Sequence, residues 1–244
     1  MITGRTPAGY VRITASRRVV VTLETHAADA TALLADGSLY EAAARTISAR
    51  PMQGRGIAYA IALPVTHAPA VVRHNRHGGF LAGLTRDVFL PPSRAPYELL
   101  VARRLADAGV PTPVVIMYGL TPAAGVLCRS DVVTREIVGG RDLSSYMLAT
   151  EPSAARANAW AATRELVGQL AAAGARHHDL NVRNVLLAES GETLMAYALD
   201  VDRVTFGRPN SDDVMAANSQ RLLRSARKWR DERGAVFDER DVRG

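Results

Sequence analysis

The chain has 244 residues and a formal net charge of +6, from 30 Lys and Arg against 24 Asp and Glu. Hydrophobic residues make up 48% and charged residues 22%, which is typical of a globular protein and excludes a disordered or collagen-like chain. No run of about 18 uncharged apolar residues occurs, which excludes a transmembrane helix. Gly and Pro stand near the N-terminus where a signal peptide needs an apolar run, so export is not expected.

Cysteine and lysine are nearly absent. The single cysteine, Cys128, excludes a disulfide framework and a cysteine-based zinc site, and it suits a reducing compartment. The only lysine is Lys228, so arginine supplies almost all of the positive charge. A role that usually falls to lysine must fall here to arginine, which is always charged and binds phosphate through a bidentate fork. The basic balance indicates anionic partners without choosing among phosphates, nucleic acid and a membrane surface.

The first half of the chain is rich in predicted strands. A strand over residues 19–23 precedes two short helices, and Ser38 with Glu41 forms a capping box that starts the second helix. A Gly-, Arg- and Pro-rich loop over residues 74–92 leads into a helix over residues 95–108. The other runs predicted as strands in this half are residues 57–63, 70–73, 114–118 and 126–137.

The composition changes at Gly139 and Gly140, after which helices are more frequent. Helices are predicted over residues 142–149, 153–173 and 211–231, and short strands over residues 185–187 and 194–199. We therefore predict an α+β fold with two lobes: a β-rich N-terminal lobe over residues 1–138 and a helical lobe over residues 139–244.

The most informative segment runs from His177 to Asn184 and reads His-His-Asp-Leu-Asn-Val-Arg-Asn ahead of an apolar strand. This H-x-D-L-x-x-x-N pattern is typical of a kinase catalytic loop. Asp179 would accept the proton of an attacking hydroxyl, and Asn184 would reach a magnesium ion that bridges nucleotide phosphates. The second acid that holds the metal would be Asp200, at the end of the next strand. A polar turn is the alternative, whereas a hydrolytic metal site would need further ligands that we do not find.

The first half supplies candidates for the nucleotide-binding residues. Gly54, Arg55 and Gly56 precede a strand and would form a glycine-rich loop over the phosphates, although a plain hairpin turn gives the same pattern. Arg73 ends the next strand, where a kinase has its phosphate-binding lysine, and Glu98 on the following helix would hold it in place. A favourable acid near a helix N-terminus is the plain alternative for Glu98.

Taken together, these segments resemble the 3-deoxy-D-manno-octulosonic acid (Kdo) kinases of the lipopolysaccharide core kinase group. The likeness runs in order from about residue 50 to residue 230. Its motifs lie at residues 54–56, 72–79, 97–100, 108–113, 131–137, 177–187, 199–203 and 218–228. The chain departs from the family pattern at Asn75, which replaces an aromatic residue, at His77, which replaces arginine, and at Val201, which replaces phenylalanine.

The resemblance implies a protein-kinase-like fold with a nucleotide-binding N-terminal lobe and a reduced catalytic C-terminal lobe. It implies transfer of the γ-phosphoryl group of ATP to the 4-hydroxyl of Kdo on a lipid A precursor, with ATP and Mg²⁺ required. Asp179 is then the catalytic base, Asn184 and Asp200 are the magnesium ligands, and Arg73 contacts the phosphates with Glu98 as its partner. The implied place of action is the cytoplasmic face of the inner membrane, with the protein bound peripherally.

The chain also carries features that bear on the acceptor. It ends 44 residues after Asp200 and has no A-P-E element, so we expect a small or lipid-linked sugar acceptor and not a protein. Aromatic residues make up 5% without a stacking pattern, so nucleic acid is not an expected partner. The predicted last helix carries basic residues that form either a solvated face or a patch for anionic lipid: Arg221, Arg224, Arg227, Lys228 and Arg230. Further candidates to contact the acceptor are the loop residues His74, Arg76, His77 and Arg86.

Two other functions fit parts of the pattern. A kinase of the same fold would act on a small molecule such as an antibiotic or choline, but such enzymes usually carry a His-Gly-Asp loop, whereas His178 stands here before the aspartate. A non-catalytic kinase-like module would bind nucleotide or lipid without turnover. The presence of Asp179, Asn184 and Asp200 argues against it.

Overall fold

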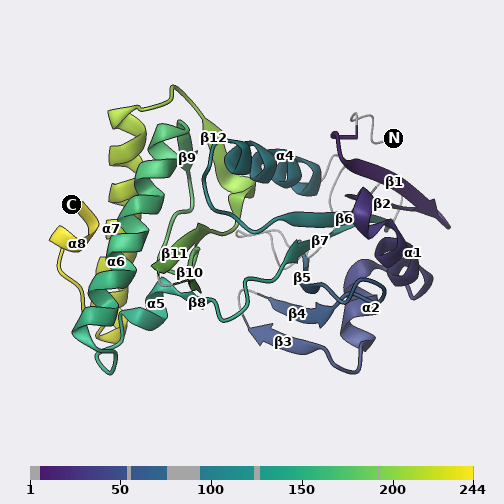
Figure 1. Ribbon diagram of the computed structural model, residues 1–244, viewed down its shortest axis with the longest axis horizontal. Coiled ribbons are helices and arrows are strands. Elements are labelled where there is room, and N and C mark those ends of the chain that lie inside the picture. The colour runs from purple at the N-terminus through teal and green to yellow at the C-terminus, as the bar shows by residue number, and fades with distance from the viewer. Residues whose placement is uncertain (1–5, 54–55, 76–93, 124–126, 192, 244) are drawn as a thin grey trace. The chain divides into compact units, whose positions relative to one another are not determined.

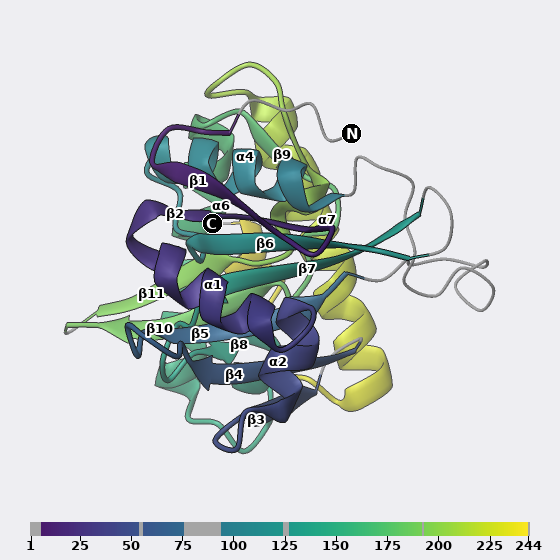
Figure 2. The same ribbon diagram turned by 90° about the vertical axis from the view of Figure 1, so that its right-hand side faces the viewer.

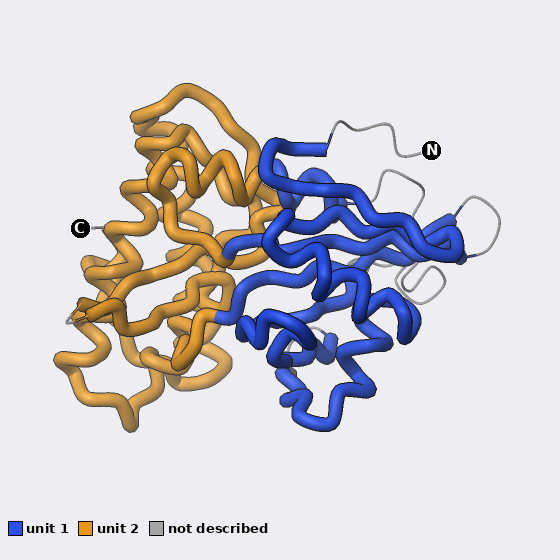
Figure 3. The backbone as a smooth tube through the Cα atoms, turned by 45° about the vertical axis from the view of Figure 1, so that its right-hand side comes forward, with its two compact units in different colours: residues 1–100, 114–136 blue, residues 101–113, 137–244 orange. Residues whose placement is uncertain are grey.

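The computed structural model describes residues 6–53, 56–75, 94–123, 127–191 and 193–243. The chain divides into two compact units, one of residues 1–100 and 114–136, the other of residues 101–113 and 137–244 (Figure 3). The predicted α+β class is confirmed, because antiparallel sheets and helices both contribute to the structure. The boundary between residues 138 and 139 stays a prediction of domain organisation.

The first unit contains a seven-stranded antiparallel sheet (Figure 1). In sheet order its strands are β1 (Tyr10–Ala15), β2 (Arg18–Leu23), β6 (Val115–Pro122), β7 (Cys128–Arg135), β5 (Pro69–His74), β4 (Ile57–Ala62) and β3 (Arg50–Gln53). The inner strands are rich in the β-branched residues that fit a pleated surface, which is why their runs were predictable. The edge strands β1 and β3 were not predicted, since Arg12 and Pro51 interrupt their apolar runs.

Two helices, α1 (Ala27–Ala35) and α2 (Leu39–Arg45), cover one face of this sheet (Figure 2). The capping box predicted at the start of α2 is present: Ser38 Oγ accepts the Glu41 N–H at 3.1 Å, and Glu41 Oε2 accepts the Ser38 N–H at 3.0 Å. The large buried side chains between these helices and the sheet are Val20, Leu33, Leu34, Leu39, Ile61, Leu63, Val72, Ile116, Met117 and Val133. Each of them contributes about 1.5–3 kcal/mol through burial.

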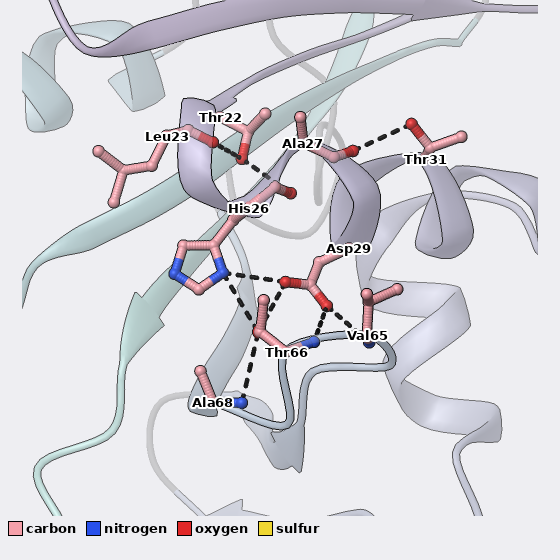
Figure 4. Close-up of polar contacts among 9 residues, drawn as sticks. All are labelled: Thr22, Leu23, His26, Ala27, Asp29, Thr31, Val65, Thr66 and Ala68. Carbon is pink, nitrogen blue, oxygen red and sulfur yellow. Dashed lines mark hydrogen bonds and ion pairs between the residues drawn. The ribbon is translucent and has the colours of Figure 1, made fainter.

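A buried carboxylate ties α1 to the turn between β4 and β5 (Figure 4). Asp29 accepts hydrogen bonds from the backbone N–H groups of Val65 (2.8 Å) and Thr66 (3.0 Å), from the Thr66 hydroxyl (2.7 Å) and from His26 Nδ1 (2.9 Å). Burial by itself raises the pKa of Asp29, but these four hydrogen bonds, led by the one from His26, lower it below its ordinary value. The ionised carboxylate therefore holds the turn in place, and the short helix η1 (Glu24–His26) leads directly into this contact.

The second unit contains two small antiparallel sheets and most of the helical residues. One sheet has the order β11 (Thr193–Ala198), β10 (Val185–Ser190), β8 (Arg141–Asp142), and the other pairs β12 (Val204–Phe206) with β9 (Ala175–His177). The helices are α5 (Leu143–Tyr146), α6 (Ser153–Ala172), η2 (Val201–Arg203), α7 (Asp212–Arg233) and α8 (Arg240–Arg243). Helix α4 (Arg94–Asp107) gives residues 94–100 to the first unit and the remainder to the second.

The two long helices of the second unit, α6 and α7, pack against each other, and α6 also covers β11 (Figure 1). Trp160 on α6 is almost fully buried, with its ring centroid 5.9 Å from that of Phe237. Helix α7 lies against β9 as well. It therefore reaches the loop between β9 and β10, which carries the predicted catalytic residues.

Candidate active site

Arg73 lies on β5, with β4 and β7 hydrogen bonded on either side. Its guanidinium forms an ion pair with Glu98 of α4 and also donates a hydrogen bond to Asn75 Oδ1 at 3.0 Å. The Glu98 side chain is 4% exposed and that of Arg73 is 27% exposed. Two buried acceptors therefore orient a partly exposed guanidinium, a geometry suited to bidentate binding of phosphate. Asn75, which departs from the family pattern, is thus one of the residues that hold Arg73.

The glycine-rich segment joins β3 to β4. Gly54 and Arg55 lie outside the described residues, while Gly56 immediately precedes β4. Because β3 and β4 pair antiparallel, with Gln53 opposite Ile57, the segment connects the two strands of a hairpin. Its contact with nucleotide phosphates stays a prediction.

His74 ends β5 and contacts a buried acid of the same sheet. Its Nδ1 lies 2.6 Å from Asp131 Oδ1, and the other oxygen of Asp131 accepts the Tyr40 N–H at 3.1 Å, in the first turn of α2. Asp131 thus links β5, β7 and α2. The other loop residues predicted to contact the acceptor, Arg76, His77 and Arg86, lie outside the described residues.

His177 fixes the start of the loop over residues 177–184. Its Nε2 donates to the Leu199 carbonyl at 2.8 Å, and its Nδ1 accepts the Asp179 N–H at 3.2 Å. These two partners assign the neutral Nε2–H tautomer, since a protonated ring has no acceptor for Asp179. Burial lowers the pKa of His177, although the Leu199 carbonyl and nearby carboxylates act in the opposite direction. The ring is therefore neutral near pH 7 and ties Asp179 to the strand end at Leu199.

The same loop brings Asp179 and Asn184 together. The Asp179 carbonyl accepts hydrogen bonds from Asn184 Nδ2 at 2.8 Å and from Asn181 Nδ2 at 2.9 Å. The Asn184 carbonyl accepts the Leu199 N–H at 2.9 Å, and Leu199 directly precedes Asp200. The Asn184 side chain is thus bound to the Asp179 backbone, and the Asn184 backbone is bound to Leu199, the residue before Asp200. Asp200 has left-handed backbone angles (φ 51°, ψ 46°), an uncommon conformation that costs energy outside glycine and clusters at functional sites.

Asn184 and Asp200 offer oxygen ligands of the kind that Mg²⁺ prefers. Because Asn184 Nδ2 is bound to the Asp179 carbonyl, the side-chain atom left for a cation is Oδ1. Within the described ranges, no group of three or more His, Cys, Asp or Glu side chains is arranged to hold a metal. A pair of protein oxygen ligands fits Mg²⁺, which commonly takes one or two carboxylates and completes its shell with water and substrate phosphates.

Asn218 of α7 anchors the strand that leads into the catalytic loop. Its Oδ1 accepts the His177 N–H at 2.9 Å, and its Nδ2 donates to the Ala175 carbonyl at 3.0 Å. The Asn218 side chain is buried, so both bonds are shielded from water. This support was not predicted, because it joins residues that are far apart in the sequence.

Arg221 and Ser225 extend the same face of α7 toward the loop. Arg221 Nη2 lies 3.3 Å from Asp179 Oδ1, and Ser225 Oγ accepts the Val182 N–H at 3.2 Å. The spacing of Asn218, Arg221 and Ser225 places them on one side of a helix with 3.6 residues per turn. From the sequence, Arg221 belongs either to a solvated basic face or to a patch for anionic lipid, whereas in the structure it contacts the predicted catalytic base.

Three of the other basic residues of α7 have acidic partners within the chain. Arg227 binds both carboxylate oxygens of Glu239, at 2.8 and 2.6 Å. Lys228 lies 3.9 Å from Glu232, and Arg230 lies 3.4 Å from Asp231. These acids offset much of the positive charge of the helix. Arg224, Lys228 and Arg230 are all exposed.

In the part of the chain that the structure describes, no helix is both long and apolar enough to cross a bilayer.

Residues 44–242 match the model of a family described as lipopolysaccharide kinase (Kdo/WaaP).

Two curated relatives cover most of the chain. The 3-deoxy-D-manno-octulosonic acid kinase of Stenotrophomonas maltophilia (strain K279a) is 31% identical over 201 residues, covering 79% of this chain and 76% of the relative. The kinase of the same name from Actinobacillus succinogenes is 29% identical over 194 residues, covering 78% of this chain and 79% of the relative. A solved structure described as WaaP in complex with acyl carrier protein is similar with a TM-score of 0.49 and 18% identity, covering 79% of this chain and 74% of that chain.

Proposed function

Since the chain belongs to the lipopolysaccharide kinase (Kdo/WaaP) family and is thus an ATP-dependent kinase, we propose that it phosphorylates the 4-hydroxyl of Kdo on a lipid A precursor. The observation that carries the proposal is the loop over residues 177–184. There His177 and Asn184 hold the backbone of Asp179, and 17% of the Asp179 side chain is exposed. The names of the relatives support Kdo as the sugar.

In this reaction Asp179 orients the attacking hydroxyl and accepts its proton. The hydroxyl oxygen forms a bond to the γ-phosphorus of ATP, the bond from that phosphorus to the bridging oxygen breaks, and ADP leaves. His177 holds the backbone of Asp179 in place, because its neutral ring accepts the Asp179 N–H and donates a hydrogen bond to the Leu199 carbonyl. Positioning and electrostatic stabilisation together supply most of the rate enhancement in phosphoryl transfer.

Nucleotide binding falls to the other predicted residues. We propose that Arg73, oriented by Glu98 and Asn75, contacts the phosphates of ATP in place of the usual lysine. We propose that Asn184 Oδ1 and the Asp200 carboxylate hold Mg²⁺, which neutralises charge on the phosphates when bound. Contact of residues 54–56 with the phosphates belongs to the same proposal.

We further propose that the protein acts at the cytoplasmic face of the inner membrane, where ATP and a lipid-linked acidic sugar meet. The net charge of +6 supports a peripheral contact with anionic lipid, since each basic residue near such a surface contributes about 1 kcal/mol. Co-sedimentation with vesicles of anionic lipid, but not with neutral ones, is the expected result at low salt. Equal recovery with both vesicle types would contradict a charge-driven contact.

The proposed function is tested by phosphoryl transfer from γ-labelled ATP to a Kdo-bearing lipid A precursor. Asp179→Asn removes the base without changing the size of the side chain, and the rate is expected to fall at least about 100-fold. Glu189→Gln, which removes an exposed carboxylate of the same unit, is the matched control and should transfer normally. Equal transfer by wild type and Asp179→Asn would refute the role of Asp179. Transfer only to another hydroxyl compound would refute Kdo as the acceptor, and ATP binding without any transfer would favour a non-catalytic module.

A further inference from the structure

Basic side chains gather on the exposed side of the β9–β12 pair. In this pair His177 lies opposite Val204 and Arg176 lies opposite Thr205. His177 and Val204 are buried, and successive side chains on a strand point to opposite faces, so Arg176 and His178 project toward solvent. Arg203 is also exposed, and its carbonyl accepts the His178 N–H at 3.0 Å.

Arg221 adds a fourth basic group from α7. Its side chain is 43% exposed, and its Nη2 lies at the long distance of 3.3 Å from Asp179 Oδ1. A guanidinium has five N–H donors in a planar fork that matches a carboxylate or a phosphate, so Arg221 can bind a second anionic group. We call Arg176, His178, Arg203 and Arg221 the basic cluster.

The positive charges of the basic cluster act on His178. Desolvation lowers the pKa of His178, and the positive charges of Arg176, Arg221 and Arg203 lower it further. Three guanidinium groups therefore act on one imidazole next to Asp179. His178 Nε2 also lies 2.8 Å from the Thr205 hydroxyl, which fixes its ring on the exposed face.

We infer that the basic cluster binds an anionic group of the acceptor, so that the attacked hydroxyl faces Asp179. The inference rests on the proposed function and names the chemistry by which that acceptor is selected. Nucleotide phosphates already have a proposed contact in Arg73 and a proposed metal site at Asn184 and Asp200. In the basic cluster, by contrast, Arg221 contacts Asp179, the residue that receives the proton of the acceptor. Kdo carries a carboxylate, and a lipid A precursor carries phosphates, so either group presents the oxygens that an arginine fork binds. Arg221 is expected to contribute most to this binding, because its guanidinium would leave Asp179 and bind the anionic group of the acceptor.

The test compares acceptor binding and transfer for wild type, Arg221→Gln and the double variant Arg176→Gln/Arg203→Gln. Arg233→Gln, in the last turn of the same helix, is the control with an equal loss of charge. Three acceptors are used: the Kdo-bearing lipid A precursor, its Kdo methyl ester and its dephosphorylated form. The dissociation constant of each is measured with an unreactive ATP analogue present, so binding is recorded independently of turnover. The KM for ATP and the thermal midpoint of each variant are recorded as well.

Arg221→Gln is expected to weaken binding of the intact acceptor about 10- to 100-fold, the factor for a lost charge-assisted hydrogen bond. The KM for ATP should not change. The loss should be much smaller with the methyl ester if the cluster binds the carboxylate, and with the dephosphorylated lipid if it binds a phosphate. Arg221→Lys should recover part of the affinity, since it keeps the charge but not the fork.

An equal fractional loss on all three acceptors, or a loss that follows the thermal midpoint, would overturn the inference and leave a structural role. If Arg221→Gln and Arg176→Gln/Arg203→Gln both bind the acceptor as wild type does, and wild type transfers phosphate, the inference is overturned but the proposed function stands. If wild type neither binds nor phosphorylates any of the three acceptors, the proposed function is overturned, and the inference with it.

Discussion

Asn218 offers the sharpest test of how α7 supports the catalytic loop. β9 pairs with β12 through the Gly174 carbonyl, which accepts the Gly207 N–H at 2.8 Å, and through the His178 N–H. Hydrogen bonding alternates along an antiparallel strand, so the peptide groups of Ala175 and His177 point the other way, toward α7. The amide of Asn218 meets both of them and acts as a neighbouring strand would.

Asn218→Ala removes both partners at once. Asn218 is 1% exposed, so water cannot replace either bond unless the surrounding packing opens. Each buried group left unsatisfied costs about 1–3 kcal/mol, which gives about 2–6 kcal/mol for the pair. Asn218→Asp keeps the acceptor for the His177 N–H but faces the Ala175 carbonyl with a carboxylate, so it should not restore stability. The rate of phosphoryl transfer should fall in both variants, because His177 is the first residue of the catalytic loop.

The assay is equilibrium unfolding in urea, followed by circular dichroism, with wild type and each variant at equal concentration. Gln220→Ala, two residues along α7 and exposed, is the control and should change stability by less than about 0.5 kcal/mol. A change below about 1 kcal/mol for Asn218→Ala, with an unchanged slope, would refute the reasoning. It would mean that β9 does not depend on α7 for its hydrogen bonds.

Two further predictions concern titration and the nucleotide. Burial lowers the pKa of His177 in the native state. Below the ordinary pKa of 6.5, the unfolded state therefore binds a proton that the native state does not bind. The free energy of unfolding should decrease as the pH falls through this range. The difference between the urea midpoints at pH 7.5 and pH 5.5 measures this loss of stability. His177→Gln should make the difference smaller. An equal difference in the variant would exclude His177 as its source. Arg73→Lys should raise the KM for ATP about tenfold, equivalent to ~1.4 kcal/mol, because an ammonium group cannot keep the fork that Glu98 and Asn75 orient. An unchanged KM in steady-state kinetics would contradict this role of Arg73.

Local patterns were readable from the sequence because their causes are local. The capping box at Ser38 and Glu41 lies within one helical turn, and both of its hydrogen bonds are present. The run over residues 19–23 is β-branched and appears as β2, and the helix predicted over residues 95–108 appears as α4 over residues 94–107. The interruption of β1 at Arg12 hid an edge strand, since one face of an edge strand tolerates charge.

The support of the candidate site was not readable, because it depends on contacts between distant segments. The basic spacing on the last helix fits either a solvated face or a lipid patch, but the fold brings Arg221 beside Asp179 and pairs Arg227 with Glu239. Asn75 departed from the family pattern and gave no sign that it would bind Arg73. Tertiary structure decides which partner a long polar side chain meets.

The most direct measurement is the structure of the phosphorylated product. Wild-type protein, ATP and a Kdo-bearing lipid A precursor are incubated, and the product is analysed by mass spectrometry and ³¹P NMR. We predict one added phosphate, attached at the 4-hydroxyl of Kdo, with ADP formed in equal amount. When Asp179 is replaced by Asn, the product should form at least about 100-fold more slowly. A phosphate on any other hydroxyl would contradict the proposed acceptor, and product formation by the Asp179→Asn variant at the wild-type rate would contradict the proposed catalytic residue.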